Sequence, residues 1–137
     1  MKYTESYMNN LFKNFLLPGE ESLCGVYCGF PETGFFAKPG RMQIGFATCT
    51  NYGRLLFVRQ YLTEYTPGSL KLDTVKKLNI KKTVFGQINI DATFPTDKKD
   101  IRLKMQIAKK IYGVNFPNQE QNLTTMMTIL QRYETPL

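Results

Sequence analysis

The chain has 137 residues, of which 42% are hydrophobic, and it carries a formal net charge of +7. This length favours one domain with a single core. The positive charge favours anionic partners such as nucleic acid, lipid head groups or acidic proteins. Histidine is absent, which excludes a Ser-His-Asp triad and a Cys-His dyad. The three cysteines are an odd count that predicts buried free thiols rather than a disulfide framework.

Other signatures of chemistry are missing from the sequence. It contains neither GxGxxG nor GxxxxGK[ST], the usual phosphate-cradling loops. The cysteines alone offer too few ligands for a metal site. Residues 1–10 are polar, unlike a signal peptide, and no apolar run approaches the ~20 residues that span a bilayer. We therefore expect a cytoplasmic, non-enzymatic binding protein without a cofactor or metal.

The first segment of the chain is amphipathic. Its apolar residues recur at helical spacing: Tyr3, Tyr7, Met8, Leu11, Phe12 and Phe15. Pro18-Gly19 ends this helix, so we separate an N-terminal helix, residues 1–17, from a domain over residues 18–137. The helix either packs on that domain or docks on a partner. Membrane docking by the helix is disfavoured because its polar face has only Lys2 and Lys13 as cations.

Residues 41–61 form the central hairpin of the predicted fold. Apolar residues alternate with polar or small ones over residues 42–47, the period of a half-buried strand. Asn51 and Gly53 tolerate the positive φ angles of a tight turn. The second strand, at residues 55–58, is apolar on both faces. A first strand over residues 22–30 precedes the hairpin.

Four more strands are predicted after the hairpin, over residues 69–73, 75–82, 84–94 and 101–107. A turn at Thr66-Pro67-Gly68 precedes them, and Gly86 is expected to mark a bulge. Seven short strands at regular spacing are typical of a barrel or sandwich.

The last predicted element is a helix over residues 118–133. Asn118 fits an N-cap, with Gln121 as its capping-box partner. One apolar stripe runs along the helix: Leu123, Met126, Met127, Leu130 and Tyr133. We expect this stripe to cover the open mouth or corner of a small barrel. The expected fold class is mainly β, a seven-stranded antiparallel barrel or sandwich capped by this helix, with the N-terminal helix added.

Two parts of the sequence resemble a known family. Residues 17–21 (LPGEE), then a strand, then residues 48–58 (TCTNYGRLLFV) resemble the LPGE…TN-x-RLLF pattern of bacterial pleckstrin-homology-like (PH-like) and GRAM-like domains. The order of seven strands and a helix extends the likeness over residues 18–135. The resemblance implies a binding or adaptor module for phosphoinositides, other anionic lipids or peptides. Some bacterial members of the family assemble into rings.

The first loop after the first strand is one expected binding site. It places Phe35 and Phe36 before Lys38 and Arg41, and an apolar tip beside cations suits an anionic membrane interface. Alternatively, the two phenylalanines fold back into the barrel mouth. Lipid-binding members of the family carry basic residues here, but this loop also holds Glu32, so the chain departs from the phosphoinositide pattern.

A second expected site is the basic segment with Lys76, Lys77, Lys81 and Lys82. Further lysines of the same basic set are Lys98, Lys99, Lys104, Lys109 and Lys110. Lys77 and Lys81 share one face of the predicted strand, which either holds phosphates or is solvated surface. A strand edge that accepts a peptide strand or a second subunit is a further option.

Two alternatives to a lipid or peptide module stay open. A single-stranded nucleic-acid-binding barrel would have cations and exposed aromatic residues along one face, whereas a lipid or peptide module would have cations clustered at one end. A self-assembling structural protein would use the N-terminal helix as its contact. In the membrane interpretation, the protein is cytoplasmic and peripheral to the membrane.

Overall fold

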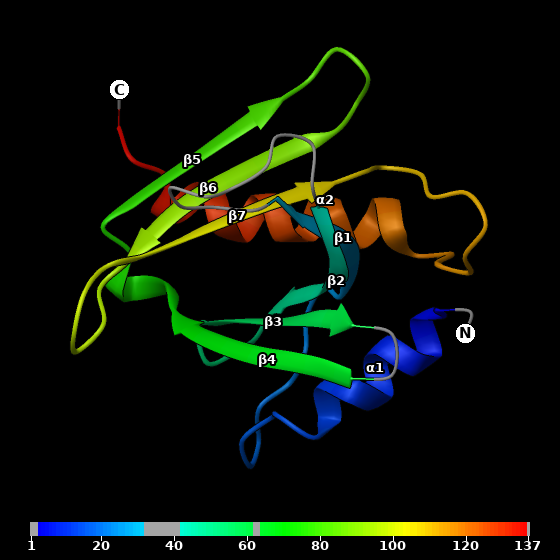
Figure 1. Ribbon diagram of the computed structural model, residues 1–137, viewed down its shortest axis with the longest axis horizontal. Coiled ribbons are helices and arrows are strands. Elements are labelled where there is room, and N and C mark those ends of the chain that lie inside the picture. Colours follow the sequence, from blue (N-terminus) through cyan, green and yellow to red (C-terminus); the bar gives the residue numbers. More distant parts are fainter. Residues whose placement is uncertain (1–2, 32–41, 62–63, 137) are drawn as a thin grey trace.

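The computed structural model describes residues 3–31, 42–61 and 64–136 (Figure 1). Seven antiparallel strands form one sheet in the order β4-β3-β2-β1-β7-β6-β5. The strands are β1 Val26–Pro31, β2 Met42–Cys49, β3 Arg54–Tyr61, β4 Glu64–Lys71, β5 Lys77–Lys82, β6 Ile88–Phe94 and β7 Ile101–Ile107. The helices are α1 Glu5–Lys13 and α2 Gln119–Leu130, and 3-10 turns cover Leu72–Thr74 and Gln131–Tyr133.

The sheet has two halves that meet at β1 and β7. The pairing between these two strands places Gly29 opposite Gln106. In Figure 1, β5, β6 and β7 run together in the upper half, while β3 and β4 diverge from them below. β4 and β5 are the edges of the sheet and do not pair with each other, so the sheet is not closed. The expected fold class, seven antiparallel strands and a C-terminal helix, is confirmed. The strands form an open sheet and not a closed barrel.

The main core lies between the inner faces of the two halves and α2. The expected stripe of α2 packs into it: Leu123, Met126, Met127 and Leu130 are buried, and Tyr133 is partly buried. The three cysteines are also buried and free, as predicted. α2 therefore fills the space that the open sheet leaves between its halves, because its apolar stripe cannot face water without cost.

A second core lies on the other face of β2 and β3, under α1. Met8 and Phe12 of this helix are buried against Phe46, Leu56 and Val58. The prediction that residues 55–58 are apolar on both faces is therefore confirmed, since α2 and the opposite strands cover one face and α1 covers the other. Of the two roles considered for the N-terminal helix, the structure shows packing on the chain's own sheet.

The capping box predicted for the C-terminal helix is wrong. Asn118 is the N-cap of α2, but its side chain makes no capping hydrogen bond. Its Nδ2 and its backbone N–H donate instead to the carboxylate of Glu5, at 2.8 and 3.0 Å. The start of α1 is thereby attached to the start of α2.

The turn predicted at Thr66-Pro67-Gly68 is also wrong, because these residues lie within β4. Proline is tolerated there since β4 is an edge strand, and the nitrogen of Pro67 can face away from β3. Gly68 is required by packing rather than by a turn. A Cβ at this position would lie 2.3 Å from the ring of Phe57.

Two other boundaries differ from the prediction. Gly86 is not a bulge within a strand but lies in the β5–β6 turn with φ +81°, and β6 begins only at Ile88. β1 begins at Val26, and Ser22 contributes an isolated bridge to Thr50. Within the described residues, no helix is long and apolar enough to cross a membrane.

Candidate functional site

The lysines of the predicted basic segment do not form one cluster. Lys76 lies at the start of β5 and pairs with Asp100 at 3.0 Å. Lys77 and Lys81 share the outer face of β5, as expected, and Lys82 is the last residue of the strand. The four lysines are thus spread along the whole length of β5. The other predicted site, with Phe35, Phe36, Lys38 and Arg41, lies outside the described residues.

The turn between β5 and β6 exposes two large apolar side chains. Val84 is 96% exposed and Phe85 is 92% exposed. The turn itself is ordered by hydrogen bonds: Thr83 donates to the carbonyl of Gln87 at 2.9 Å, and Gly86 donates to that of Thr83 at 3.1 Å. A rigid turn therefore presents an apolar tip to solvent.

The connection after β7 leaves the sheet at the same end. The register places Ile88, just after the β5–β6 turn, opposite Ile107, the last residue of β7. Figure 1 shows both connections projecting from this end of β5, β6 and β7. The second one carries Tyr112, which is 90% exposed. We call the two segments, residues 81–87 and 108–113, the apolar end.

Cations surround the apolar residues of this end. Lys81 and Lys82 precede one tip, Lys109 and Lys110 precede the other, and all four are exposed. Lys109 also pairs with Glu120 at 3.3 Å. Neither 81–90 nor 104–119 contains an acidic residue. The apolar end therefore combines exposed apolar side chains with a local positive charge, the chemistry expected for the loop at residues 30–40.

The outer face of β5, β6 and β7 is basic but not aromatic. Its cations are Lys77, Lys81, Arg102 and Lys104, and Asp91 is its only acidic residue. Arg102 binds Asp91 through two hydrogen bonds of 2.9 and 2.6 Å, and these bonds lower the pKa of the Asp91 carboxyl. The other residues of this face are Asn79, Asn89, Thr93 and Gln106, so it offers no ring on which a base could stack.

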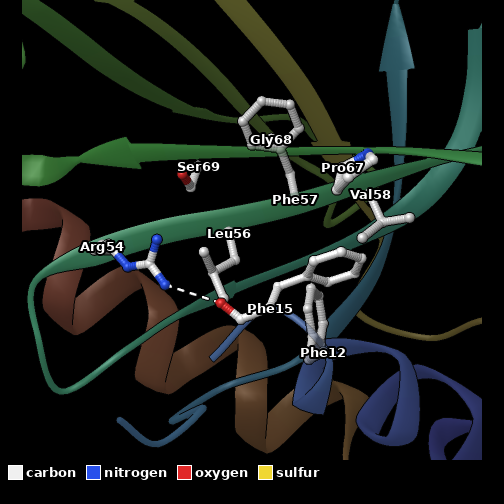
Figure 2. A pocket seen from close by; sticks show the side chains of 9 residues that line it. All are labelled: Phe12, Phe15, Arg54, Leu56, Phe57, Val58, Pro67, Gly68 and Ser69. Carbon is white, nitrogen blue, oxygen red and sulfur yellow. Dashed lines mark hydrogen bonds between the residues drawn. The ribbon is translucent and has the colours of Figure 1, made fainter. Parts of the chain in front are cut away.

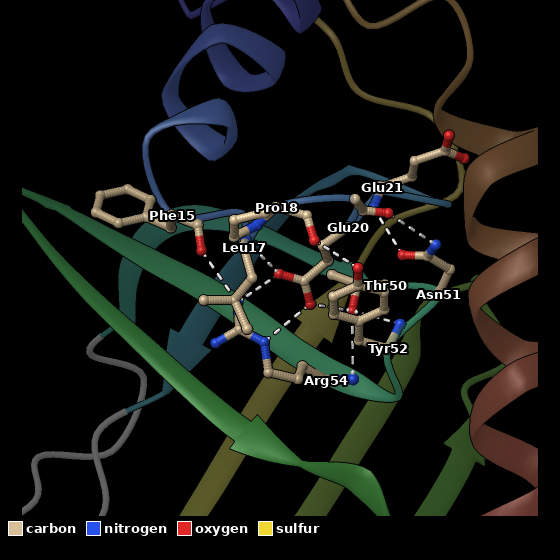
Figure 3. A network of polar contacts seen from close by, with 10 residues as sticks. Phe15, Leu17, Pro18, Glu20, Glu21, Thr50, Asn51, Tyr52 and Arg54 are labelled. Carbon is tan, nitrogen blue, oxygen red and sulfur yellow. Dashed lines mark hydrogen bonds and ion pairs between the residues drawn. The ribbon is translucent and has the colours of Figure 1, made fainter.

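The residues of the LPGE…TN-x-RLLF pattern form a network of polar contacts (Figure 3). The Glu20 carboxylate accepts hydrogen bonds from Arg54 Nε at 2.9 Å and from Arg54 Nη2 at 2.6 Å. It also accepts from the backbone N–H of Leu17 at 2.8 Å and from Thr50 Oγ1 at 2.6 Å. Arg54 Nη2 donates in addition to the carbonyl of Phe15 at 3.0 Å. We call this arrangement the Glu20–Arg54 clamp.

The clamp is buried and fixes the loop after α1 to the β2–β3 hairpin. The Glu20 side chain is 0% exposed and that of Arg54 is 16% exposed. The hydrogen bonds from Arg54 lower the pKa of Glu20 to about 2. Asn51 of the hairpin adds a hydrogen bond, accepting from the backbone N–H of Glu21 at 2.6 Å. Because every oxygen of Glu20 is engaged, the clamp is built to hold structure.

Sequence reasoning missed a second buried polar side chain, Gln119, which is 3% exposed. Its Nε2 donates to the carbonyls of Tyr27 and Ala108 at 2.9 and 3.0 Å, and its Oε1 accepts from the N–H of Tyr27 at 3.0 Å. It therefore satisfies backbone groups of β1 and of the segment after β7. The one sequence signal that sets Gln119 apart is its position at the start of a helix, next to the N-cap.

Two solved structures have a similar fold. One is the crystal structure of the C-terminal domain of an unknown protein from Leishmania infantum, which is 16% identical, with 93% of this chain and 97% of that chain covered and a TM-score of 0.50. The other is the hSac2 domain from the human phosphoinositide phosphatase Sac2, which is 11% identical, with 98% and 92% covered and a TM-score of 0.57. No family model and no curated protein matches the chain.

At these identities the likeness shows the fold alone. It extends over nearly the whole of this chain and of each of the two solved chains. The predicted order of elements, seven antiparallel strands and then a helix, is present. The assignment to the PH-like family, with its bacterial and GRAM-like members, and the cytoplasmic location stay predictions.

Proposed function

We propose that the chain is a non-enzymatic PH-like module that docks on anionic membrane surfaces through its apolar end. The observation that carries the proposal is the β5–β6 tip, where Val84 and Phe85 are almost fully exposed just after Lys81 and Lys82. Two adjacent, large apolar side chains that an ordered turn holds in solvent are typical of an interaction site.

The energies favour an anionic membrane as the partner. Full burial of each of these side chains is worth about 1.5–3 kcal/mol. A lysine near an anionic bilayer surface adds about 1 kcal/mol. The apolar tip and the three lysines other than Lys109, which pairs with Glu120, therefore contribute comparable amounts, and neither suffices alone for stable binding. The hSac2 domain comes from a phosphoinositide phosphatase, and phosphoinositides are membrane lipids, which is compatible with this role.

The alternatives are supported less well by the same surfaces. A single-stranded nucleic-acid module needs aromatic side chains and cations along one face. The basic outer face of β5–β7 has no aromatic residue, and the exposed Phe85 and Tyr112 lie in the connections at one end of these strands. Self-assembly through the apolar stripe of α1 would compete with the packing of Met8 and Phe12 on the chain's own sheet.

The test is co-sedimentation with vesicles of phosphatidylcholine alone or with phosphatidylserine, at low and at physiological salt. We expect binding to the phosphatidylserine vesicles that persists at physiological salt. The Val84→Ser/Phe85→Ser variant should lose about a hundredfold in partitioning, since about 3 kcal/mol of apolar transfer is removed. The protein should remain folded because both side chains lie outside the core.

A charge-matched pair of variants locates the site. Lys82→Glu/Lys110→Glu reverses two charges at the apolar end, whereas Lys98→Glu/Lys99→Glu makes the same change in the β6–β7 turn at the other end of these strands. Only the first pair should abolish binding. Equal losses from both pairs, or wild-type binding by the Val84→Ser/Phe85→Ser variant, would leave only diffuse attraction and refute the proposal. Binding to oligonucleotides instead of vesicles would favour the nucleic-acid alternative.

A further inference from the structure

A pocket of about 300 Å³ opens between α1 and the strands β3 and β4 (Figure 2). Phe12, Leu56 and Val58 line it with side chains that are themselves buried. Figure 2 shows the rings of Phe12 and Phe15 on one side of the pocket and Arg54 with Ser69 on the other. The pocket thus has an apolar part and a polar end.

The size of the pocket suits one short chain-like ligand. Binding pockets for small molecules begin at about 300 Å³. A methylene group takes up about as much space as a water molecule, roughly 30 Å³, so the volume corresponds to on the order of ten carbon atoms. An apolar chain of this length would contact the rings of α1 and the branched side chains of β3.

The neighbouring edge strand is poorly suited to a peptide strand. Pro67 lines the pocket at the middle of β4 and has no N–H to donate to an added strand. A ligand that makes no backbone hydrogen bonds to β4 is therefore favoured over a peptide that adds a strand to the sheet.

The polar end favours a carboxylate. The hydrogen bonds of Arg54 to Glu20 and to the Phe15 carbonyl use Nε and Nη2, so within the part of the chain that the structure describes Nη1 is the guanidinium nitrogen that remains for a ligand. Glu20 neutralises the charge of Arg54, but Lys71 pairs opposite Arg54 in the β3–β4 ladder and is exposed on the same face. Lys71 thus supplies the net positive charge, and the Ser69 hydroxyl adds a donor.

We propose that this pocket binds an amphiphile with an apolar chain of about ten carbons and a carboxylate head, of which a medium-chain fatty acid is the simplest. The chain lies between Phe12 and Val58, and the head meets Arg54, Ser69 and Lys71. The proposal rests on α1, β3 and β4 alone and does not depend on membrane docking by the apolar end.

The first experiment titrates the full chain with decanoate below its micelle concentration and follows the NMR signals of Phe12, Leu56 and Val58. Saturable shifts of these signals are expected. Ser69→Trp should abolish them, because a large side chain on this exposed strand position closes the pocket without entering the core. Thr66→Trp, on the same strand but its opposite face, is the matched control and should bind as the wild type does.

The second experiment tests the head group by comparing decanoate with decanol. Lys71→Glu should weaken decanoate about tenfold and leave decanol unchanged, while Lys98→Glu, a distant and equal charge change, should affect neither. Equal affinity for the two ligands, or undiminished binding by Ser69→Trp, would overturn the proposal. Shifts that depend on protein concentration without a ligand would assign the pocket to contacts between copies instead. The Val84→Ser/Phe85→Ser variant should bind decanoate normally, which separates this proposal from membrane docking.

Discussion

Replacing Glu20 with glutamine removes the charge of the Glu20–Arg54 clamp while keeping its shape. The Arg54 guanidinium, whose side chain is 16% exposed, would then lack its counter-ion in a nearly buried position. Glutamine also offers only one acceptor oxygen, whereas both oxygens of Glu20 accept hydrogen bonds from Arg54. We therefore expect the Glu20→Gln variant to fold with substantially reduced stability.

The expected loss in the free energy of unfolding follows from the pKa of Glu20. It is lowered from 4.5 to about 2, and one pKa unit corresponds to about 1.4 kcal/mol. Neutralising the carboxyl therefore costs the folded state about 3 kcal/mol. This agrees with the range of about 3–5 kcal/mol for breaking a buried ion pair by removing one partner. With a urea m-value of about 1.5 kcal/mol/M, the unfolding midpoint should fall by about 2 M.

The exposed ion pair between Asp91 and Arg102 is a matched control. Its two hydrogen bonds, at 2.9 and 2.6 Å, have the same lengths as those between Arg54 and Glu20. Its side chains are 36% and 56% exposed, however. Asp91→Asn should therefore cost less than about 1 kcal/mol.

Urea unfolding followed by circular dichroism measures both variants. The two pairs share the lengths of their Arg–carboxylate hydrogen bonds, but Glu20 is buried and also accepts from Leu17 and Thr50. A loss below 1 kcal/mol for Glu20→Gln, or equal losses for the two variants, would show that burial and these added hydrogen bonds do not strengthen the clamp and would refute the reasoning.

Two other predictions concern the same scaffold. Since the folded-state pKa of Glu20 is depressed, its stabilisation is fully present above about pH 4.5 and is lost as the pH falls toward 2; the urea midpoint of the wild type should fall more steeply over this range than that of Glu20→Gln, and parallel curves would contradict the assignment. Gly68→Ala should destabilise the protein by about 1–3 kcal/mol because its Cβ would meet the Phe57 ring. Thermal unfolding should show a smaller loss from the same change in a Phe57→Leu background.

The parts of the fold that the sequence predicted correctly are those with a simple period and a local turn. The β2–β3 hairpin has Gly53 at φ +74°, where the turn signal required it. β6 and β7 alternate inward and outward residues as their sequence does. The stripe of α2 is buried as a unit. In each case the residues that decide the structure are neighbours in the sequence or lie one helical turn apart.

The errors have a common physical origin in contacts between distant residues. Pro67-Gly68 carries turn chemistry, but Phe57 on the adjacent strand requires the glycine, and the edge position tolerates the proline. Asn118 has the signature of a capping box, but the carboxylate of Glu5 provides a stronger acceptor more than a hundred residues away. Such partners are visible only when the fold brings them together.

The apolar tip was missed for a different reason. Residues 84–94 have the composition of one long strand, and Val84 and Phe85 are typical strand residues. Two signals argue against a strand at this position: Phe85 breaks the alternation that begins at Ile88, because it has the parity of the polar residues Gln87 and Asn89, and Gly86 follows it. The prediction for the loop with Phe35 and Phe36 rests on an apolar pair beside cations, and the structure presents this chemistry at the β5–β6 turn.

The clamp and the apolar end differ in what folding requires of them. Glu20 and Arg54 meet across two loops in a buried position, where a mismatch costs several kcal/mol. Val84, Phe85 and Tyr112 are almost fully exposed and lie outside the core, so folding does not require apolar side chains at these positions. A search for binding residues should therefore begin at positions where folding alone would leave polar side chains.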